Sequence, residues 1–151
     1  MTDYALLIQQ LLGLAKEDPD AMPLLANASA LLYDSLEEVN WAGFYLWQKG
    51  RLTLGPFQGK VACIHIEKGK GVCGTALLKD EVQRVEDVHA FPGHIAYDSA
   101  SRSEIVLPLH KEGKVFGVLD IDSPILSRFS PEDEEGLRAF ASALEEVIYL
   151  A

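Results

Sequence analysis

The sequence predicts an α+β fold, in which a mainly antiparallel sheet is covered by helices from the two ends of the chain. Segments with helical periodicity lie near both ends, and segments of alternating apolar and polar residues lie between them. Short turn sequences join neighbouring strands as hairpins. At 151 residues the chain has the length of one domain, so we expect a single domain over 1–151.

Three terminal segments are expected to be helical. Apolar residues recur at helical spacing over 2–16. The second helix is expected over 18–36, because an aspartate followed by Pro19 is typical of a helix start. The last helix is expected over 130–149, where Ser130 precedes a proline and three acidic residues that favour the positive end of the helix dipole.

The central segments alternate between apolar and polar residues or are aromatic-rich, and each is short enough to be a strand. These segments are 40–47, 51–54, 61–66, 104–109 and 114–122. The dipeptides Lys49-Gly50 and Glu112-Gly113 predict hairpin turns between them. The stretch 82–103 is irregular apart from an extended piece near Val85, and irregular stretches of that length in compact domains are usually functional.

Composition narrows the function. The formal net charge of −10 excludes a basic footprint for nucleic acid and suits a protein that binds small molecules. No apolar run approaches bilayer length, and the N-terminus has no basic region of a signal peptide, so we expect a cytoplasmic protein without a membrane segment. In that compartment the two cysteines are expected to be free thiols or redox groups.

Two aspartates end an apolar strand, and they predict a site for a small positive group. Asp120 and Asp122 share one face of the strand because side chains alternate with period two. Paired carboxylates on a sheet face need a cationic partner. The alternative is a strand that runs out into solvent before Pro124. Glu104 opens a neighbouring apolar strand, either as a third carboxylate of the same site or as a polar strand end.

The first strand presents a large aromatic face notched by a glycine. That face is either a wall for the apolar part of a ligand or a second buried face beneath a helix. Its residues are Trp41, Gly43, Tyr45 and Trp47, and the opposite face, expected in the core, is formed by Ala42, Phe44 and Leu46.

The two cysteines have different expected roles. Cys73 precedes a short helical stretch, 75–78, where the helix dipole lowers the pKa of a thiol, so it is a candidate nucleophile. Cys63 is expected to be a buried, inert strand residue unless the loop brings the two thiols together.

Other motifs are less informative. The glycine spacing over 69–74 matches a dinucleotide fingerprint, but the following helix is too short for a crossover to a parallel strand. The four histidines show no metal-ligand spacing, although two of them could assist a site in the irregular stretch. The four are His65, His89, His94 and His110, and the two in the irregular stretch are His89 and His94. We therefore expect no metal site.

These residues together resemble the free methionine-(R)-sulfoxide reductase family, whose members are single GAF domains. The resemblance covers nearly all of 40–129. Its motifs are Asn40-Trp-Ala-Gly-Phe-Tyr45, Leu54-Gly-Pro-Phe-Gln-Gly-Lys60, Gly69-Lys-Gly-Val-Cys-Gly74, Asp87-Val-His-Ala-Phe-Pro-Gly-His94, Ser103-Glu-Ile-Val106 and Leu119-Asp-Ile-Asp-Ser-Pro124.

The resemblance implies a six-stranded, mostly antiparallel GAF sheet, usually in a homodimer, and a site for free methionine sulfoxide. It implies that Trp41 and Tyr45 cup the methyl group, while Glu104, Asp120 and Asp122 hold the ammonium and sulfoxide groups. In such a reductase a thiolate attacks the sulfoxide and a second thiol forms a disulfide. A dithiol donor such as thioredoxin then restores the enzyme, without a bound cofactor.

The sequence departs from the family at one decisive position. The family has three cysteines, and the third, usually the nucleophile, is replaced by Tyr97. A phenol cannot follow the thiol route. Three interpretations remain: a weaker reductase in which Cys73 attacks and Cys63 resolves, a binding or sensor protein without turnover, and an inherited scaffold with a different ligand.

Overall fold

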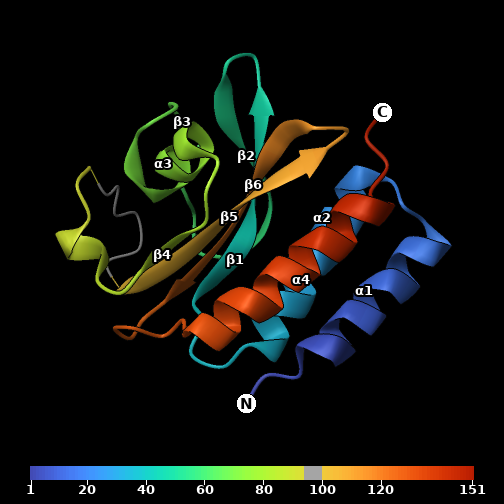
Figure 1. Cartoon of the computed structure of the whole chain (residues 1–151), viewed down its shortest axis with the longest axis horizontal. Helices are drawn as coiled ribbons and strands as arrows, with labels where there is room; N and C mark the ends of the chain where they lie inside the picture. Colours follow the sequence, from blue (N-terminus) through green and yellow to red (C-terminus); the bar gives the residue numbers. More distant parts are fainter. Residues whose placement is uncertain (94–99) are drawn as a thin grey trace.

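The computed structural model describes residues 1–93 and 100–151, and in this part of the chain six strands form one antiparallel sheet (Figure 1). The strand order is β3-β2-β1-β6-β5-β4, and each neighbouring pair is antiparallel. The strands are β1 (Trp41–Gln48), β2 (Arg51–Gly59), β3 (His65–Ile66), β4 (Gln83–Val85), β5 (Ser103–Lys111) and β6 (Lys114–Ser123). The expected α+β class and mainly antiparallel sheet are therefore confirmed.

The helices divide between the two faces of the sheet. Three terminal helices cover one face, as expected, and α3 (Gly71–Lys79) lies on the other with β3 (Figure 1). The three are α1 (Tyr4–Glu17), α2 (Ala21–Ser35) and α4 (Pro131–Val147). A 3₁₀ turn, η1 (Val88–Ala90), interrupts the irregular stretch. Within the described ranges, no helix is both long and apolar enough to cross a bilayer.

Each sheet face has its own apolar cluster, and the alternation of β1 and β6 separates them. Phe44, Leu119 and Ile121 are fully buried in the larger cluster beneath α1, α2 and α4. Trp41 and Tyr45 belong to the smaller cluster beneath α3. The assignment of opposite residues to opposite faces is therefore confirmed for both strands.

Both predicted hairpin turns are present. Lys49 and Gly50 have φ values of 54° and 79°, and Glu112 and Gly113 have φ values of 55° and 78°. Two consecutive residues with positive φ are typical of the type I′ turn, whose twist matches that of a two-stranded hairpin. Glycine adopts the second conformation without the steric penalty of a side chain.

Several expected element boundaries are wrong, and one of them is the start of α3, which begins at Gly71 rather than at Thr75. The second helix begins at Ala21 because Asp18 ends α1, and the Asp18 Oδ1 atom accepts a hydrogen bond from the backbone of Asp20 at 3.0 Å. Of the segment expected as a strand over 61–66, only His65 and Ile66 are paired in the sheet. The chain between β2 and β3 therefore runs outside the sheet.

Strand β2 also continues beyond its expected end, through a bulge. Tyr45 pairs with Leu54, but Gly43 pairs with Phe57, so β2 contains one extra residue between these two pairs. An extra residue reverses the alternation of side chains after the bulge. Phe57 consequently faces the same cluster as Leu52 and Leu54, although simple alternation would place it on the opposite face.

The final helix has the N-terminal cap that the sequence predicts. The Ser130 hydroxyl accepts a hydrogen bond from the Asp133 backbone at 3.1 Å, and the Asp133 carboxylate accepts one from the Ser130 backbone at 3.0 Å. Burial opposes ionisation of Asp133, but hydrogen bonds from Ser130 and Tyr4 and the charge of Arg128 hold the pKa of this carboxyl below its ordinary value. The capping box therefore also ties α1 to α4.

Replacing Ser130 with alanine should lower the free energy of unfolding by about 1 kcal/mol, because the helix loses its cap. Urea unfolding followed by circular dichroism measures the change. The matched control is Ser142→Ala on the same helix, where the serine is exposed and a change within about 0.5 kcal/mol is expected. Equal effects of the two variants would contradict the capping role.

Candidate functional site

The acidic residues meet where three central strands lie side by side. Asp122 pairs with Trp41 of β1 on one side and with Glu104 of β5 on the other. Asp120 pairs with Gly43 and Val106 in the same manner. Directly paired residues share a face, so the sheet places all three acids beside the aromatic residues of β1.

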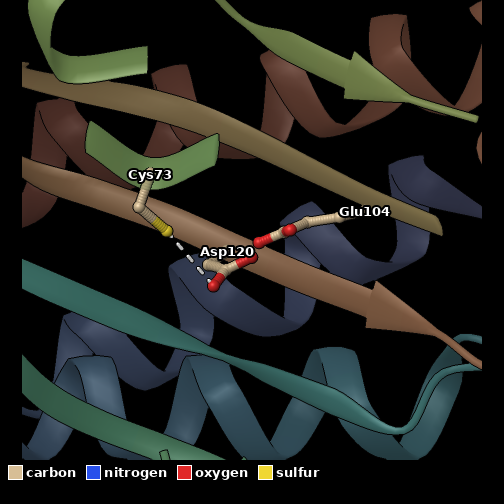
Figure 2. A group of neighbouring side chains, drawn as sticks. All are labelled: Cys73, Glu104 and Asp120. Atoms are coloured by element: carbon tan, nitrogen blue, oxygen red, sulfur yellow. Dashed lines mark hydrogen bonds between the residues drawn. The ribbon is translucent and has the colours of Figure 1, made fainter. Parts of the chain in front are cut away.

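These acids are withdrawn from solvent, and a thiol lies over them. Asp120 and Glu104 are 5% and 6% exposed, and Asp122 is half-buried. The Cys73 thiol donates a hydrogen bond to Asp120 Oδ2 at 3.3 Å. Figure 2 shows Cys73 reaching down from α3 while the Glu104 carboxyl points toward Asp120. The Cys73 Sγ atom and one carboxyl oxygen of each of Glu104 and Asp120 lie within 4.8 Å of one another.

Burial and the neighbouring acids keep Glu104 protonated. Burial raises the pKa of Glu104 well above its ordinary value, and the charges of Asp120 and Asp122 raise it further. Glu104 is therefore a hydrogen-bond donor to its neighbours when no cation is bound. The strand end that opens on Glu104 is a third carboxyl of the cluster rather than a solvated terminus.

The expected lowering of the Cys73 pKa is wrong for this structure. Cys73 does lie in the first turn of α3, but burial and the charges of Asp120 and Glu104 raise its thiol pKa well above the ordinary value. Desolvation and nearby carboxylates outweigh the favourable dipole of a nine-residue helix. Cys73 is thus a neutral thiol hydrogen-bonded to a potential proton acceptor.

The expectation that Cys63 is a buried strand residue is also wrong. Cys63 is half-exposed, lies between β2 and β3, and donates from Sγ to the His65 carbonyl at 3.0 Å. It packs against the same apolar cluster that contains Cys73, and both cysteines are free. The two cysteines therefore belong to one apolar cluster, and a meeting of the two thiols stays a prediction.

An aromatic wall adjoins the acids. The Trp41 ring stacks with Tyr45, at a centroid distance of 6.0 Å, and with Phe57, at 5.1 Å. Its indole Nε1 donates to the Lys60 carbonyl at 3.1 Å. The Tyr45 hydroxyl donates to the Cys63 carbonyl at 2.8 Å, and burial raises the phenol's pKa so that it remains a donor. This face is buried beneath α3, as the second alternative states, and its role as a wall for a ligand stays a prediction.

The remaining candidates lie apart from the acid cluster or outside the described residues. His65 is 3.3 Å from Thr53, His89 is 3.6 Å from Asp87, and the His110 ring lies between Asp80 at 2.6 Å and Glu145 at 3.3 Å. Tyr97 and His94 fall in the segment that the structure does not describe. Trp47 is partly buried at the far end of the aromatic face.

Cys73, Glu104 and Asp120 form the one group in the described part of the chain spaced closely enough to hold a metal ion. Two of these three groups have raised pKa values, so a metal would have to displace protons from the thiol and from Glu104. An organic ammonium needs only the carboxylates as acceptors. The donor set therefore fits an ammonium better than a metal.

Comparison with known proteins identifies the class. Residues 7–148 match the model of the GAF domain, so the chain belongs to the GAF domain family. It is 54% identical over 145 residues to the free methionine-R-sulfoxide reductase of Escherichia coli, covering 96% of this chain and 88% of that protein. The chain is therefore also a member of the free methionine-R-sulfoxide reductase family.

Solved structures give the same assignment. The reduced form of fRMsr of Staphylococcus aureus superposes with a TM-score of 0.95 at 49% identity, over 99% of this chain and 97% of that one. A structure of the same Staphylococcus protein in complex with substrate gives a TM-score of 0.93 at 48% identity, over 99% and 97% of the two chains. The expected GAF fold and family resemblance are confirmed.

Phe57 is the site residue that the sequence analysis did not assign. It lies within the motif Leu54–Lys60, but the strand was expected to end at Leu54. Gly55 and Pro56 carried the signal for a bulge, because both residues are disfavoured in a regular strand interior and accepted at irregular or edge positions. A bulge there would have placed Phe57 beside Trp41.

Glu104 makes the stability of the protein depend on pH. As pH rises past the ordinary glutamate pKa, Glu104 ionises in the unfolded chain but keeps its proton in the folded protein. The contribution of Glu104 to the free energy of unfolding is full below about pH 4.5. It declines as the pH rises toward the raised pKa of Glu104 in the folded protein. Cys73 adds a similar decline only above about pH 9.

Glu104→Gln should therefore raise the melting temperature at pH 8 by roughly 2–4 °C and reduce its decline between pH 5 and pH 8. Calorimetric melts of the ligand-free protein at several pH values measure both effects. Glu17→Gln, at an exposed position on α1, is the matched control and should leave the slope unchanged. A decline of the melting temperature with pH that persists in Glu104→Gln would show that another group produces it.

Proposed function

We propose that the protein binds free methionine-(R)-sulfoxide and reduces it with Cys73 as nucleophile and Cys63 as resolving thiol. One contact supports both binding and chemistry: the Cys73 thiol donates to Asp120 inside a buried acid cluster. A relative that is 48% identical over 99% of this chain is known in complex with its substrate. The carboxylates suit the ammonium group of this amino acid, the thiol suits its sulfoxide, and the aromatic wall suits its methyl group.

The ligand groups have distinct partners in the site. The ammonium meets the carboxylates of Asp120 and Asp122 and neutralises part of their charge. The methyl group packs on the ring faces of Trp41 and Tyr45. The acids select a free amino group, because a peptide-bound methionine has no ammonium to pair with them.

Ligand binding also activates the thiol. The negative charges that raise the Cys73 pKa are those that the ammonium offsets, so bound substrate favours the thiolate. Cys73 Sγ transfers its proton to Asp120 Oδ2, 3.3 Å away, and attacks the sulfoxide sulfur. A protonated carboxyl such as Glu104 donates its proton to the sulfoxide oxygen.

The electron balance is complete with the two cysteines. The oxygen passes to Cys73 as a sulfenic acid and methionine leaves. The Cys63 thiol then displaces the hydroxyl, which gives a disulfide and one water. One sulfoxide and two thiols thus yield one thioether, one disulfide and one water, and an external dithiol protein of the thioredoxin type reduces the disulfide.

Turnover is proposed to be slow, because Tyr97 occupies the position of the family's third cysteine. The neutral, buried state of Cys73 also favours a second candidate function, a sensor or regulatory module that binds methionine sulfoxide without reducing it. The resemblance further implies a homodimer, and sedimentation equilibrium at micromolar concentration would show a mass of two chains.

Calorimetric titration should show that free methionine-(R)-sulfoxide binds more than about 100-fold more tightly than its N-acetyl derivative. Removing the ammonium leaves buried carboxylates without their cation. Asp122→Asn should weaken binding of the free amino acid and narrow this ratio while leaving the fold intact. Equal affinities of the two ligands for the wild type would remove the ammonium role of the acids.

Tyr97→Cys should raise turnover of methionine-(R)-sulfoxide with dithiothreitol by about 100-fold, because the acids and the wall already orient the substrate. Tyr33→Cys, on the exposed surface of α2, controls for the added thiol and should have no effect. Residual wild-type activity should disappear in Cys73→Ser.

Wild-type activity that survives Cys73→Ser would contradict the proposed nucleophile. Tight binding without any turnover, in the wild type and in Tyr97→Cys alike, would favour the sensor function. A protein that neither binds methionine sulfoxide nor gains activity from Tyr97→Cys has a different ligand.

A further inference from the structure

We propose that Phe57 is a positioning residue that holds the Trp41 indole in place and thereby sets which S-alkyl group the aromatic wall accepts. This inference rests on the proposed function, since it concerns how the same site recognises a sulfoxide. It extends the two-residue aromatic wall to three rings supplied by two strands.

The Phe57 ring lies almost parallel to Trp41, with an interplanar angle of 15° and a centroid distance of 5.1 Å. That contact is closer than the one between Trp41 and Tyr45, which is 6.0 Å. Trp41 is only 3% exposed, and the rings of Phe57 and Tyr45 both stack with its indole. The indole cannot tilt toward β2 while Phe57 stands there.

Two glycines provide the space for this arrangement. A Cβ atom on Gly43 would lie 2.3 Å from Phe57 Cβ and 2.7 Å from its Cα. A Cβ atom on Gly59, whose φ is +130°, would lie 2.6 Å from Trp41 Cδ1. A side chain at either position would displace one of the stacked rings, so the close approach of β1 and β2 requires glycine here.

The bulge of β2 brings Phe57 to this face, and a partly buried hydroxyl contact from α2, shared with a carbonyl of α2 itself, supports the bulge. The fully buried Ser29 hydroxyl on α2 lies 3.1 Å from the Pro56 carbonyl and 2.8 Å from the Leu25 carbonyl. Pro56 directly precedes Phe57, so α2 fixes the bulge from the opposite side of the sheet. The Lys60 carbonyl then accepts the Trp41 indole N–H at 3.1 Å, which fixes the edge of the ring.

The consequence is that the position of the Trp41 indole, and with it the space for the S-alkyl group, is fixed. With Phe57 present, the indole is held by its stacking contact with β2, and the site is shaped for a small S-alkyl group. Without the Phe57 ring, the indole can move toward β2, which loosens contact with a methyl group and makes room for an ethyl group. The signature of a positioning role is therefore a change in selectivity, beyond a uniform loss of affinity.

The test compares binding of methionine sulfoxide and ethionine sulfoxide to wild type, Phe57→Ala, Phe57→Leu and Phe57→Tyr by calorimetry. Phe57→Ala should bind methionine sulfoxide about three- to tenfold more weakly, the range expected for loss of an aromatic pair. Its affinity for ethionine sulfoxide should fall less, so that the ratio of the two affinities shifts toward ethionine sulfoxide by about threefold. Phe57→Leu keeps apolar volume and should shift the ratio in the same direction, whereas Phe57→Tyr keeps the ring and the wild-type ratio.

The control Val115→Ala changes a partly buried residue of the same apolar cluster, on β6 and away from the stacked rings. It should leave the ratio unchanged. In a Trp47→Phe background, Phe57→Ala should also increase acrylamide quenching of Trp41, which reports the indole without any ligand. The quenching control is Phe57→Tyr, which should match the wild type.

An unchanged affinity ratio and unchanged quenching in Phe57→Ala would overturn the inference. The proposed function would still be supported if the wild type binds methionine sulfoxide. A ratio that shifts equally in Val115→Ala would also overturn it, since general loosening would then be the cause. A wild-type protein that binds neither sulfoxide would overturn the proposed function and this inference together.

Discussion

The site is governed by the repulsion among three carboxyl groups that the sheet holds on one buried face. Backbone pairing of β6 with β1 and β5 sets Asp122 between Trp41 and Glu104, and Asp120 beneath Cys73. Low exposure prevents water from stabilising their charge, so protons remain on Glu104 and on the thiol. In the proposed function the same penalty would supply the specificity, because a ligand that brings a positive charge relieves it and a neutral ligand does not.

Side chains alternate along each strand, so the larger apolar core and the candidate site lie on opposite faces of the same sheet. The face that carries Leu119 and Ile121 is covered by three helices and forms the larger apolar core. The face that carries the aspartates is covered by α3 alone among the described helices, and its smaller cluster includes the wall and both cysteines. A charge change on the second face therefore affects binding more than folding, whereas cavities made in the first face weaken the whole domain.

Relatives with substrate bound and high identity over the whole chain place the protein in a reductase family, whereas the resemblance to that family implies that Tyr97 replaces its third cysteine. Binding and turnover depend on different parts of the site. In the proposed function the acids and the wall recognise the ligand through preorganised contacts, while reduction requires a thiol that can lose its proton. A bound cation would offset the negative charges that, together with burial, raise the pKa of Cys73.

Sequence by itself determined the sheet faces, the two type I′ hairpins, the capping box, and the clustering of Asp120 with Asp122, because each depends on neighbouring residues and on a fixed period. The family motifs also determined the GAF fold. Only the tertiary structure decided the rest. Whether Glu104 joined the acids depended on strand pairing, and the ionisation of Cys73 depended on burial and on acids 31 and 47 residues further along the chain. The reach of β2 depended on a bulge that reverses the alternation at Phe57, and a period-two pattern cannot reveal its own interruption.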